Sequence, residues 1–155
     1  PNGDSKLLIQ FLNNNDLKPV AVSQVKIDND RSKEIAAKLG GIAYVWEDHY
    51  SHNEQEAIVN AIYQKSKIAI SDRLHVLIAA YTKGVIPTDV SVVGSNKVQD
   101  HFDVLPLENV SVFESKLSKK GIIDFLQSKL DKGFDETKMN DAFNRLNKVK
   151  NELPL

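Results

Sequence analysis

The chain has 155 residues, no cysteine, and 20 basic against 21 acidic side chains, for a formal net charge of −1. This length supports one ordinary domain with a core, and the lack of cysteine excludes disulfides, thiolate metal sites and a cysteine nucleophile. The near-neutral charge gives no electrostatic footprint for nucleic acid, so we expect no nucleic-acid partner. The longest nearly apolar run, residues 74–81, is too short to span a bilayer, and we expect neither a transmembrane segment nor a signal peptide.

Hydrophobic periodicity predicts alternating helices and strands in the first part of the chain. We expect a helix over 4–13, a strand over 18–27, a helix over 30–39 that stops at Gly40-Gly41, and a strand over 42–46. A polar loop then leads to a helix over 53–65, for which we expect Asn53 as the cap. The side chains expected to face inward from this helix are Ala57, Ile58, Ala61 and Ile62.

The alternation continues to the end of the chain. We expect strands over 67–70, 86–93 and 109–113, and helices over 73–83, 95–102, 118–130 and 136–150, with Gly84 just after the first of these helices. The last helix should carry one apolar stripe, formed by Met139, Ala142, Phe143, Leu146 and Val149. Strands separated by helices favour parallel pairing with right-handed crossovers, so the predicted fold is α/β with helices on both faces of a parallel sheet.

The predicted order begins with a helix, whereas parallel α/β units ordinarily begin with a strand. This order predicts that the chain is the C-terminal half of a larger protein whose first domain lies upstream. Within the chain, we expect an α/β domain over residues 1–133 and a terminal helix over 134–155, which packs on that domain or on the missing one.

The segment from Lys67 to Gly84 is the strongest candidate for chemistry. A strand runs through Ser71-Asp72 into a helix that is apolar except for Arg73 and His75, and we expect this helix to be buried on nearly every face. The carboxyl edge of a parallel sheet is where open α/β folds bind ligands. An arginine fork, an ionisable imidazole and the N–H groups of a helix start together indicate an anion site with an acid–base group beside it.

A structural interpretation of the same residues stays open. Arg73 could pair with Asp72 or with a carboxylate of a neighbouring loop, and a lone histidine next to a buried helix is more often a hydrogen-bonded structural residue than a catalyst.

The run Ile70-Ser-Asp-Arg-Leu-His-Val-Leu-Ile-Ala-Ala-Tyr-Thr-Lys-Gly-Val85 resembles the S-x-R-L-H-x-x-x-x-A-x-x-x-G-V-P signature of the polysaccharide pyruvyl transferase family. It departs from that signature in one place, where Ile86 is inserted before Pro87. The resemblance covers about residues 5–107 and includes the strand at 19–25 and Lys97 downstream. It implies a Rossmann-like domain that forms the C-terminal half of a two-domain, GT-B-like enzyme.

The resemblance also implies an activity, the transfer of pyruvate from phosphoenolpyruvate to a sugar hydroxyl of a cell-surface glycan or a lipid-linked sugar. In such an enzyme Arg73, with Ser71 and Lys97, would bind the donor, and His75 would be the catalytic proton donor. The resemblance implies no cofactor other than this donor substrate, no metal, and a location in the cytoplasm or at the inner face of the membrane. We expect the chain alone to fold but not to turn over substrate.

Two other functions remain open from the sequence. One is the nucleotide-sugar-binding half of a GT-B glycosyltransferase, in which Glu108 would hold a ribose; the other is a non-enzymatic α/β binding module. His49 and His52 lie in a polar loop without a third ligand, and a solvated loop is the favoured interpretation there.

Overall fold

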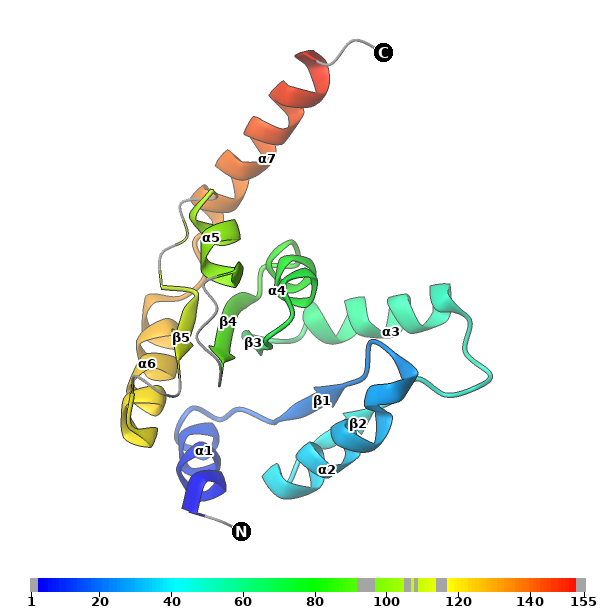
Figure 1. Cartoon of the computed structure of the whole chain (residues 1–155), viewed down its shortest axis with the longest axis vertical. Coiled ribbons are helices and arrows are strands. Elements are labelled where there is room, and N and C mark those ends of the chain that lie inside the picture. Colours follow the sequence, from blue (N-terminus) through cyan, green and yellow to red (C-terminus); the bar gives the residue numbers. More distant parts are fainter. Residues whose placement is uncertain (1–2, 92–96, 105–106, 108, 114–116, 153–155) are drawn as a thin grey trace. The chain divides into compact units, whose positions relative to one another are not determined.

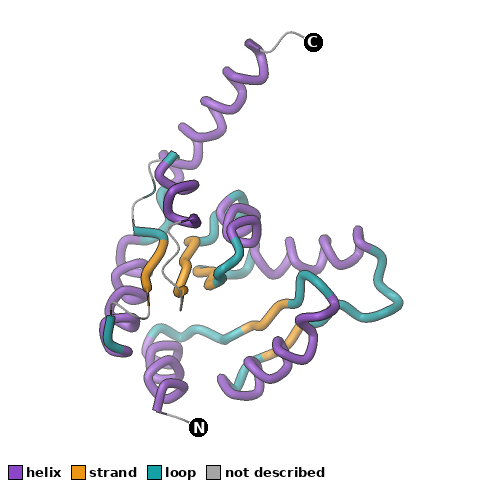
Figure 2. The backbone as a smooth tube through the Cα atoms, viewed as in Figure 1, coloured by secondary structure: helices purple, strands orange, loops and turns teal. Residues whose placement is uncertain are grey.

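The computed structural model describes residues 3–91, 97–104, 107, 109–113 and 117–152. All strand pairs in this part of the chain are parallel, and helices flank them, which confirms the Rossmann-like α/β class. The strands form two small sheets (Figure 2). The chain divides into two compact units, Pro1–Ile62 and Tyr63–Leu155. None of the helices in the described ranges is both long enough and apolar enough to cross a membrane.

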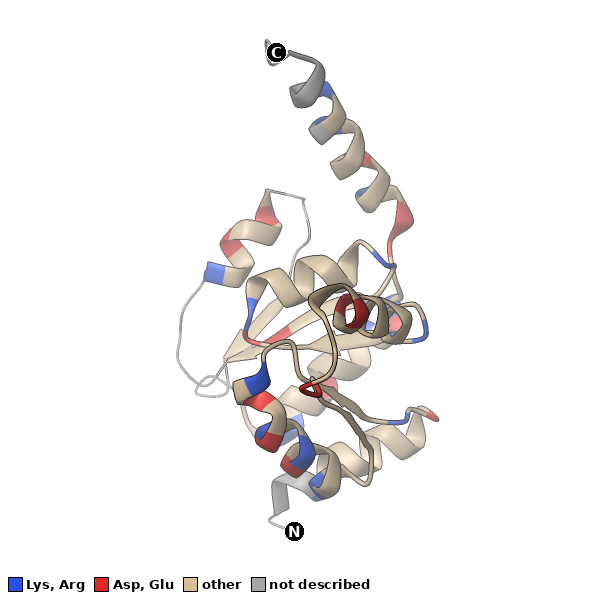
Figure 3. Ribbon diagram, turned by 90° about the vertical axis from the view of Figure 1, so that its right-hand side faces the viewer, with Lys and Arg blue, Asp and Glu red and all other residues tan. Residues whose placement is uncertain are grey.

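The first unit contains a two-stranded sheet in which one helix connects the strands. In chain order its elements are α1 (Gly3–Asn14), β1 (Val20–Val22), the short 3-10 helix η1 (Lys26–Asp28), α2 (Asn29–Leu39), β2 (Ile42–Tyr44) and α3 (His52–Tyr63). Helix α2 ends at Gly40, whose φ of 68° favours glycine, and a Cβ at Gly41 would lie 2.2 Å from the carbonyl oxygen of Pro19. Both signs of charge alternate along α2 (Figure 3).

The strand expected over 18–27 is much shorter in the structure. The ladder ends soon after Val22, where the amide of Ser23 still donates to the carbonyl of Tyr44. The chain then turns into η1, which leaves the Ile27 side chain 89% exposed. The polar pair Ser23-Gln24 interrupts the alternation that a continuous strand needs, and this explains why the extended prediction was wrong.

The start of α3 also differs from expectation. Ser51, not Asn53, caps the helix: the Glu54 amide donates to Ser51 Oγ at 3.3 Å, and Glu54 Oε2 accepts from the Ser51 amide at 2.8 Å. This reciprocal pair is a capping box, a pattern of Ser and Glu three residues apart that the sequence does contain. The inner face also differs from the predicted one. The buried residues follow at intervals of four and are Gln55, Val59 and Tyr63, whereas Ala57 and Ala61 are exposed and Ile58 and Ile62 are half-buried.

The second unit contains a three-stranded sheet of order β3-β4-β5. Its elements are β3 (Ile68–Ile70), α4 (Leu74–Tyr81), β4 (Ile86–Ser91), α5 (Lys97–Asp103), β5 (Ser111–Phe113), α6 (Lys119–Lys132) and α7 (Glu136–Glu152). Helices α4 and α6 both contact β4, and Figure 1 shows them on opposite sides of this sheet. The end of the strand expected over 86–93 and the start of the helix expected over 95–102 lie outside the described residues.

The core of the second unit lies between α4, α5 and the sheet. Its buried members are Leu77, Tyr81, Val98, Phe102 and Val110. Phe134 and Met139 pack against this cluster, so the beginning of α7 contacts this unit. Farther along the predicted stripe of α7, Ala142 is buried and Phe143 is 43% exposed, whereas the side chains of Leu146 and Val149 lie outside the described part. A domain boundary at residue 133 stays a prediction.

Candidate functional site

The link between β3 and α4 positions the predicted site residues. The amide of Ser71 donates to the carbonyl of Thr88 at 3.0 Å and holds this link against the central strand β4. The Ser71 hydroxyl accepts from the amide of Arg73 at 3.1 Å, which closes a tight turn before the helix. Arg73 is therefore the N-cap residue of α4, with φ −101° and ψ 114°, and not a member of its first turn as expected.

Helix α4 is covered on one side only. Leu77, Ala80 and Tyr81 are buried, but His75 and Ile78 are exposed, so the expectation that the helix is buried on nearly every face was wrong. The apolar composition of the helix misled the prediction because only one side of the helix, with Leu74, Leu77 and Tyr81, packs in the core. The opposite side, with its polar residues near the N-terminus, faces a pocket.

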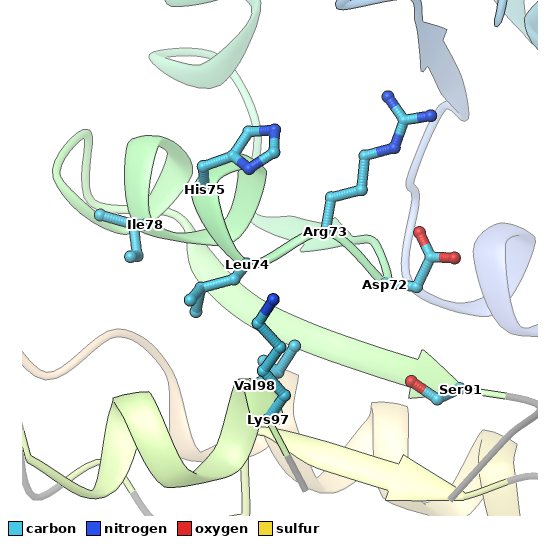
Figure 4. Close-up of a pocket in the computed structure, with 8 residues that line it drawn as sticks. All are labelled: Asp72, Arg73, Leu74, His75, Ile78, Ser91, Lys97 and Val98. Carbon is cyan, nitrogen blue, oxygen red and sulfur yellow. The ribbon is translucent and has the colours of Figure 1, made fainter. Parts of the chain in front are cut away.

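This pocket lies at the carboxyl end of β4 and has a volume of about 370 Å³. Its wall combines apolar and charged side chains from the β3–α4 link, α4, the end of β4 and the start of α5 (Figure 4): Asp72, Arg73, Leu74, His75, Ile78, Ser91, Lys97 and Val98. The volume lies in the range of small-molecule sites. The structure thus brings Arg73, His75 and Lys97 to one pocket although up to 24 residues separate them in the chain.

The charged groups are distributed around the pocket and do not meet at one point. Figure 4 shows the heads of Arg73 and His75 extending to the same side from the start of α4, while Lys97 rises from α5 toward Leu74. Figure 4 shows Ser91 at the tip of β4 and Asp72 on the link that leads to α4. Arg73 is half-buried, whereas His75 and Lys97 are exposed.

The electrostatic balance of the pocket favours an anion. Arg73 and Lys97 each contribute a positive charge, Asp72 contributes one negative charge, and the start of α4, the positive end of the helix dipole, borders the same pocket. Arginine binds a carboxylate or a phosphate through two parallel hydrogen bonds, and lysine adds a point charge. An imidazole at the edge of such a site can transfer a proton to or from a bound anion.

Ser71, which we expected to bind the donor, lies outside the pocket wall. Its hydroxyl instead holds the turn that presents Arg73. The pocket wall also includes Ser91, which the sequence interpretation missed. The signal was present as Thr88-Asp89-Val90-Ser91, a polar sequence in a central parallel strand that should otherwise be continuously apolar.

The other candidates do not form a site in the described residues. Glu108, the residue that would hold a ribose in the glycosyltransferase alternative, lies outside the described part of the chain. The His49 ring packs against Tyr50 and the His52 ring against Trp46, with centroid distances of 4.4 and 4.7 Å. Among the residues with described positions, no group of three metal-ligating side chains comes together.

Searches of protein-family models, of curated proteins and of solved structures found no match to this chain. A functional assignment therefore depends on the geometry of the pocket and on the motif that forms it.

Proposed function

We propose that the chain is a pyruvyl transferase-like domain that binds phosphoenolpyruvate in the pocket at the carboxyl end of β4. The observation that carries this proposal is the presence of Arg73, His75 and Lys97 around a single pocket of about 370 Å³. The phosphate and carboxylate of phosphoenolpyruvate need two cationic groups, and its enol carbon needs a proton donor. The pocket contains side chains that can meet each of these needs.

Arg73 is the residue best suited to hold the donor. Its backbone is fixed by the Ser71 hydroxyl at 3.1 Å, so the root of the side chain has one defined position at the helix start. A guanidinium fixed in this way can bind a planar carboxylate or one face of a phosphate through both of its terminal nitrogens. Lys97 approaches the same pocket from α5 and would bind the second anionic group.

His75 is the proposed proton donor. Addition of a sugar hydroxyl to phosphoenolpyruvate turns its methylene carbon into a methyl group, and this carbon must receive a proton. The imidazole lies in the pocket wall two residues after Arg73 and is exposed, so a bound ligand and solvent can both reach it.

The proposal extends to the context of the domain. The acceptor is a sugar of a cell-surface glycan or a lipid-linked sugar, the reaction takes place in the cytoplasm or at the inner face of the membrane, and the second wall of the active site comes from an upstream domain of a GT-B-like enzyme. On this view the chain alone binds the donor without completing transfer.

The test measures the affinity of the 155-residue chain for phosphoenolpyruvate by titration calorimetry. Arg73→Ala should weaken binding by about 10- to 100-fold, since a hydrogen-bonded charge pair contributes about 1.5–3 kcal/mol. Arg73→Lys should weaken it almost as much, because lysine cannot reproduce the two-nitrogen fork. Asp72→Asn should strengthen binding, because it removes a negative charge from the wall.

Arg145→Ala is the matched control, because Arg145 is an exposed arginine on α7 that does not line the pocket. It should bind phosphoenolpyruvate like the wild type. An Arg73→Lys variant with wild-type affinity, or a wild-type chain that does not bind phosphoenolpyruvate, would contradict the proposal.

A further inference from the structure

The central strand of the second unit contains a carboxyl group that is completely shielded from solvent. Asp89 lies on β4, pairs in register with Ser111 of β5, and has an exposed fraction of 0%. Its amide donates to the carbonyl of Val110 at 2.9 Å, so the backbone is fixed in the ladder. Placing a carboxyl here costs free energy unless its oxygens find partners.

Within the described residues, only one of the two carboxyl oxygens of Asp89 has a hydrogen-bond partner. Oδ1 accepts a hydrogen bond from the hydroxyl of Ser91, two residues later on the same strand, whereas Oδ2 accepts none. The Oγ of Ser111, in register with Asp89, also lacks a hydrogen bond among the residues described. Such incomplete pairing in a central strand calls for an explanation other than stability.

The bond to Asp89 determines how Ser91 can interact with a ligand. Because the Ser91 hydroxyl gives its proton to Asp89, its oxygen presents only lone pairs to the pocket that it lines. Ser91 therefore accepts hydrogen bonds and does not donate them. Figure 4 shows Ser91 at the tip of β4, away from His75 and Ile78, so this end of the pocket suits a group that donates a proton.

We propose that Ser91, held by Asp89, forms the subsite for the acceptor hydroxyl and receives the proton of that hydroxyl during transfer. This inference rests on the proposed function, and it adds the acceptor side of the reaction to the donor side formed by Arg73, His75 and Lys97. Ser91 touches the substrate, and Asp89 is a positioning residue that acts through Ser91.

The oxygen of the sugar hydroxyl bonds to C2 of phosphoenolpyruvate, and the electrons of the C2–C3 double bond take a proton from the His75 imidazolium. The proton of the sugar hydroxyl moves to Ser91 Oγ, while the proton of Ser91 moves to Asp89. Phosphate then leaves with the electron pair of its C2–O bond and takes the proton from Asp89 through Ser91, which leaves a cation at C2 stabilised by the sugar oxygen. A second hydroxyl of the same sugar bonds to this carbon and gives its proton to His75. The products are a cyclic ketal and phosphate, and the side chains return to their starting states.

The experiment uses the natural gene product at full length, with phosphoenolpyruvate, a pyranoside that has a free 4,6-diol, and phosphate release as the readout. Ser91→Ala and Asp89→Asn should each lower kcat by about 100-fold, the scale of a general base. The KM for phosphoenolpyruvate should remain unchanged in both variants. Ser91→Thr, which keeps the hydroxyl, should recover most of the rate.

Two controls separate this inference from the proposed function. Arg73→Lys raises the KM for phosphoenolpyruvate if the donor site is correct, whatever the role of Ser91. If Arg73→Lys behaves in this way while Ser91→Ala keeps the wild-type kcat, the acceptor subsite is wrong and the proposed function stands. If the wild type releases no phosphate, both are wrong. Should Asp89→Asn fail to fold, the pair Ser91→Ala and Ser91→Thr decides the result.

Discussion

In the first unit, side chains of the loops that leave the carboxyl ends of β1 and β2 bond to one another and to the backbone, whereas in the second unit the link after β3, the end of β4 and the start of α5 line a pocket. Asn29 donates to the carbonyl of Trp46 at 2.9 Å and accepts from its amide at 3.0 Å, which joins the two loops. The Ser23 hydroxyl bonds Ser32 at 2.9 Å, and Gln55 donates to the Ser23 carbonyl at 2.7 Å.

The difference shows that the same position in an α/β fold can serve stability or binding. At the strand ends of the first unit the Ser23 hydroxyl bonds the Ser32 hydroxyl, Gln55 bonds a backbone carbonyl, and Lys26 pairs with Asp48 at 2.9 Å. At the strand ends of the second unit Arg73, His75 and Lys97 border a pocket. The side chains that follow the strands, and not topology, therefore separate the two outcomes.

The largest effect should come from His75. We expect His75→Gln to lower the rate of pyruvyl transfer by the full-length protein by about 100-fold or more, because the proton donor is lost. The melting temperature should stay unchanged, since His75 is exposed. A thermal melt and a phosphate-release assay at saturating donor measure the two quantities.

His49→Gln is the control for this substitution, because His49 is an exposed histidine of the first unit. It should leave the rate of transfer at the wild-type value. A His75→Gln variant that is both stable and fully active would show that His75 is not the proton donor and has no greater role than His49 of the first unit.

A substitution in the first unit should have the opposite profile. Gln55→Ala leaves the carbonyl of Ser23 without its 2.7 Å hydrogen bond, so we expect the free energy of unfolding to fall by about 1–3 kcal/mol. Binding of phosphoenolpyruvate at 25 °C should not change. Urea unfolding and calorimetry test this, with the exposed Gln64→Ala as control, and a loss of affinity without a loss of stability would contradict the structural role.

A smaller effect concerns a cation of the second unit that does not line the pocket. Burial, together with the charges of Lys132 and Lys138, lowers the pKa of Lys129 from its ordinary 10.5 to about 8. Below pH 8 the folded chain must keep this amine charged in apolar surroundings, which lowers stability; above pH 8 the folded state releases the proton before the unfolded state does. Stability contributed by this group therefore rises between about pH 8 and 10.5.

Lys129→Met removes this dependence. Relative to the wild type, the variant should gain about 1–2 kcal/mol of unfolding free energy at pH 7, after allowance for partial exposure, and the gain should shrink toward pH 10.5. Urea unfolding at several pH values measures it, and Lys120→Met on the same helix controls for loss of a surface charge. A difference that stays constant with pH would show that Lys129 is not in apolar surroundings.

Much of the fold could be predicted because its signals are local. The alternation of apolar runs with amphipathic stretches predicts the α/β class, and Gly40 and Gly84, with φ of 68° and 80°, end α2 and follow α4 as expected. Two errors passed over local signals, namely the polar pair Ser23-Gln24, where β1 has ended, and the Ser51–Glu54 capping box. The error at α4 arose where tertiary contacts decide, because composition does not show which side of a helix is covered.

The site could be predicted in part because some of its residues also lie close together in the sequence. Arg73 and His75 are near neighbours in a motif, and Lys97 follows the next strand, so their approach follows from the topology of a parallel sheet. Asp89 and Ser91 carry no motif, and their contact depends on the pleat, which puts alternate residues of β4 on one face. Such pairs become evident only when a buried strand is searched for polar residues two positions apart.

The central claim, that the second unit binds an anionic donor at its strand ends while those of the first unit are closed, is tested most directly by amide chemical shifts of the ¹⁵N-labelled chain during titration with phosphoenolpyruvate. We predict saturable shifts for the amides of Arg73, His75, Ser91 and Lys97, with no change for those of Ser23, Asn29 and Trp46. Saturable shifts confined to the first unit, or none anywhere at millimolar donor, would contradict the account.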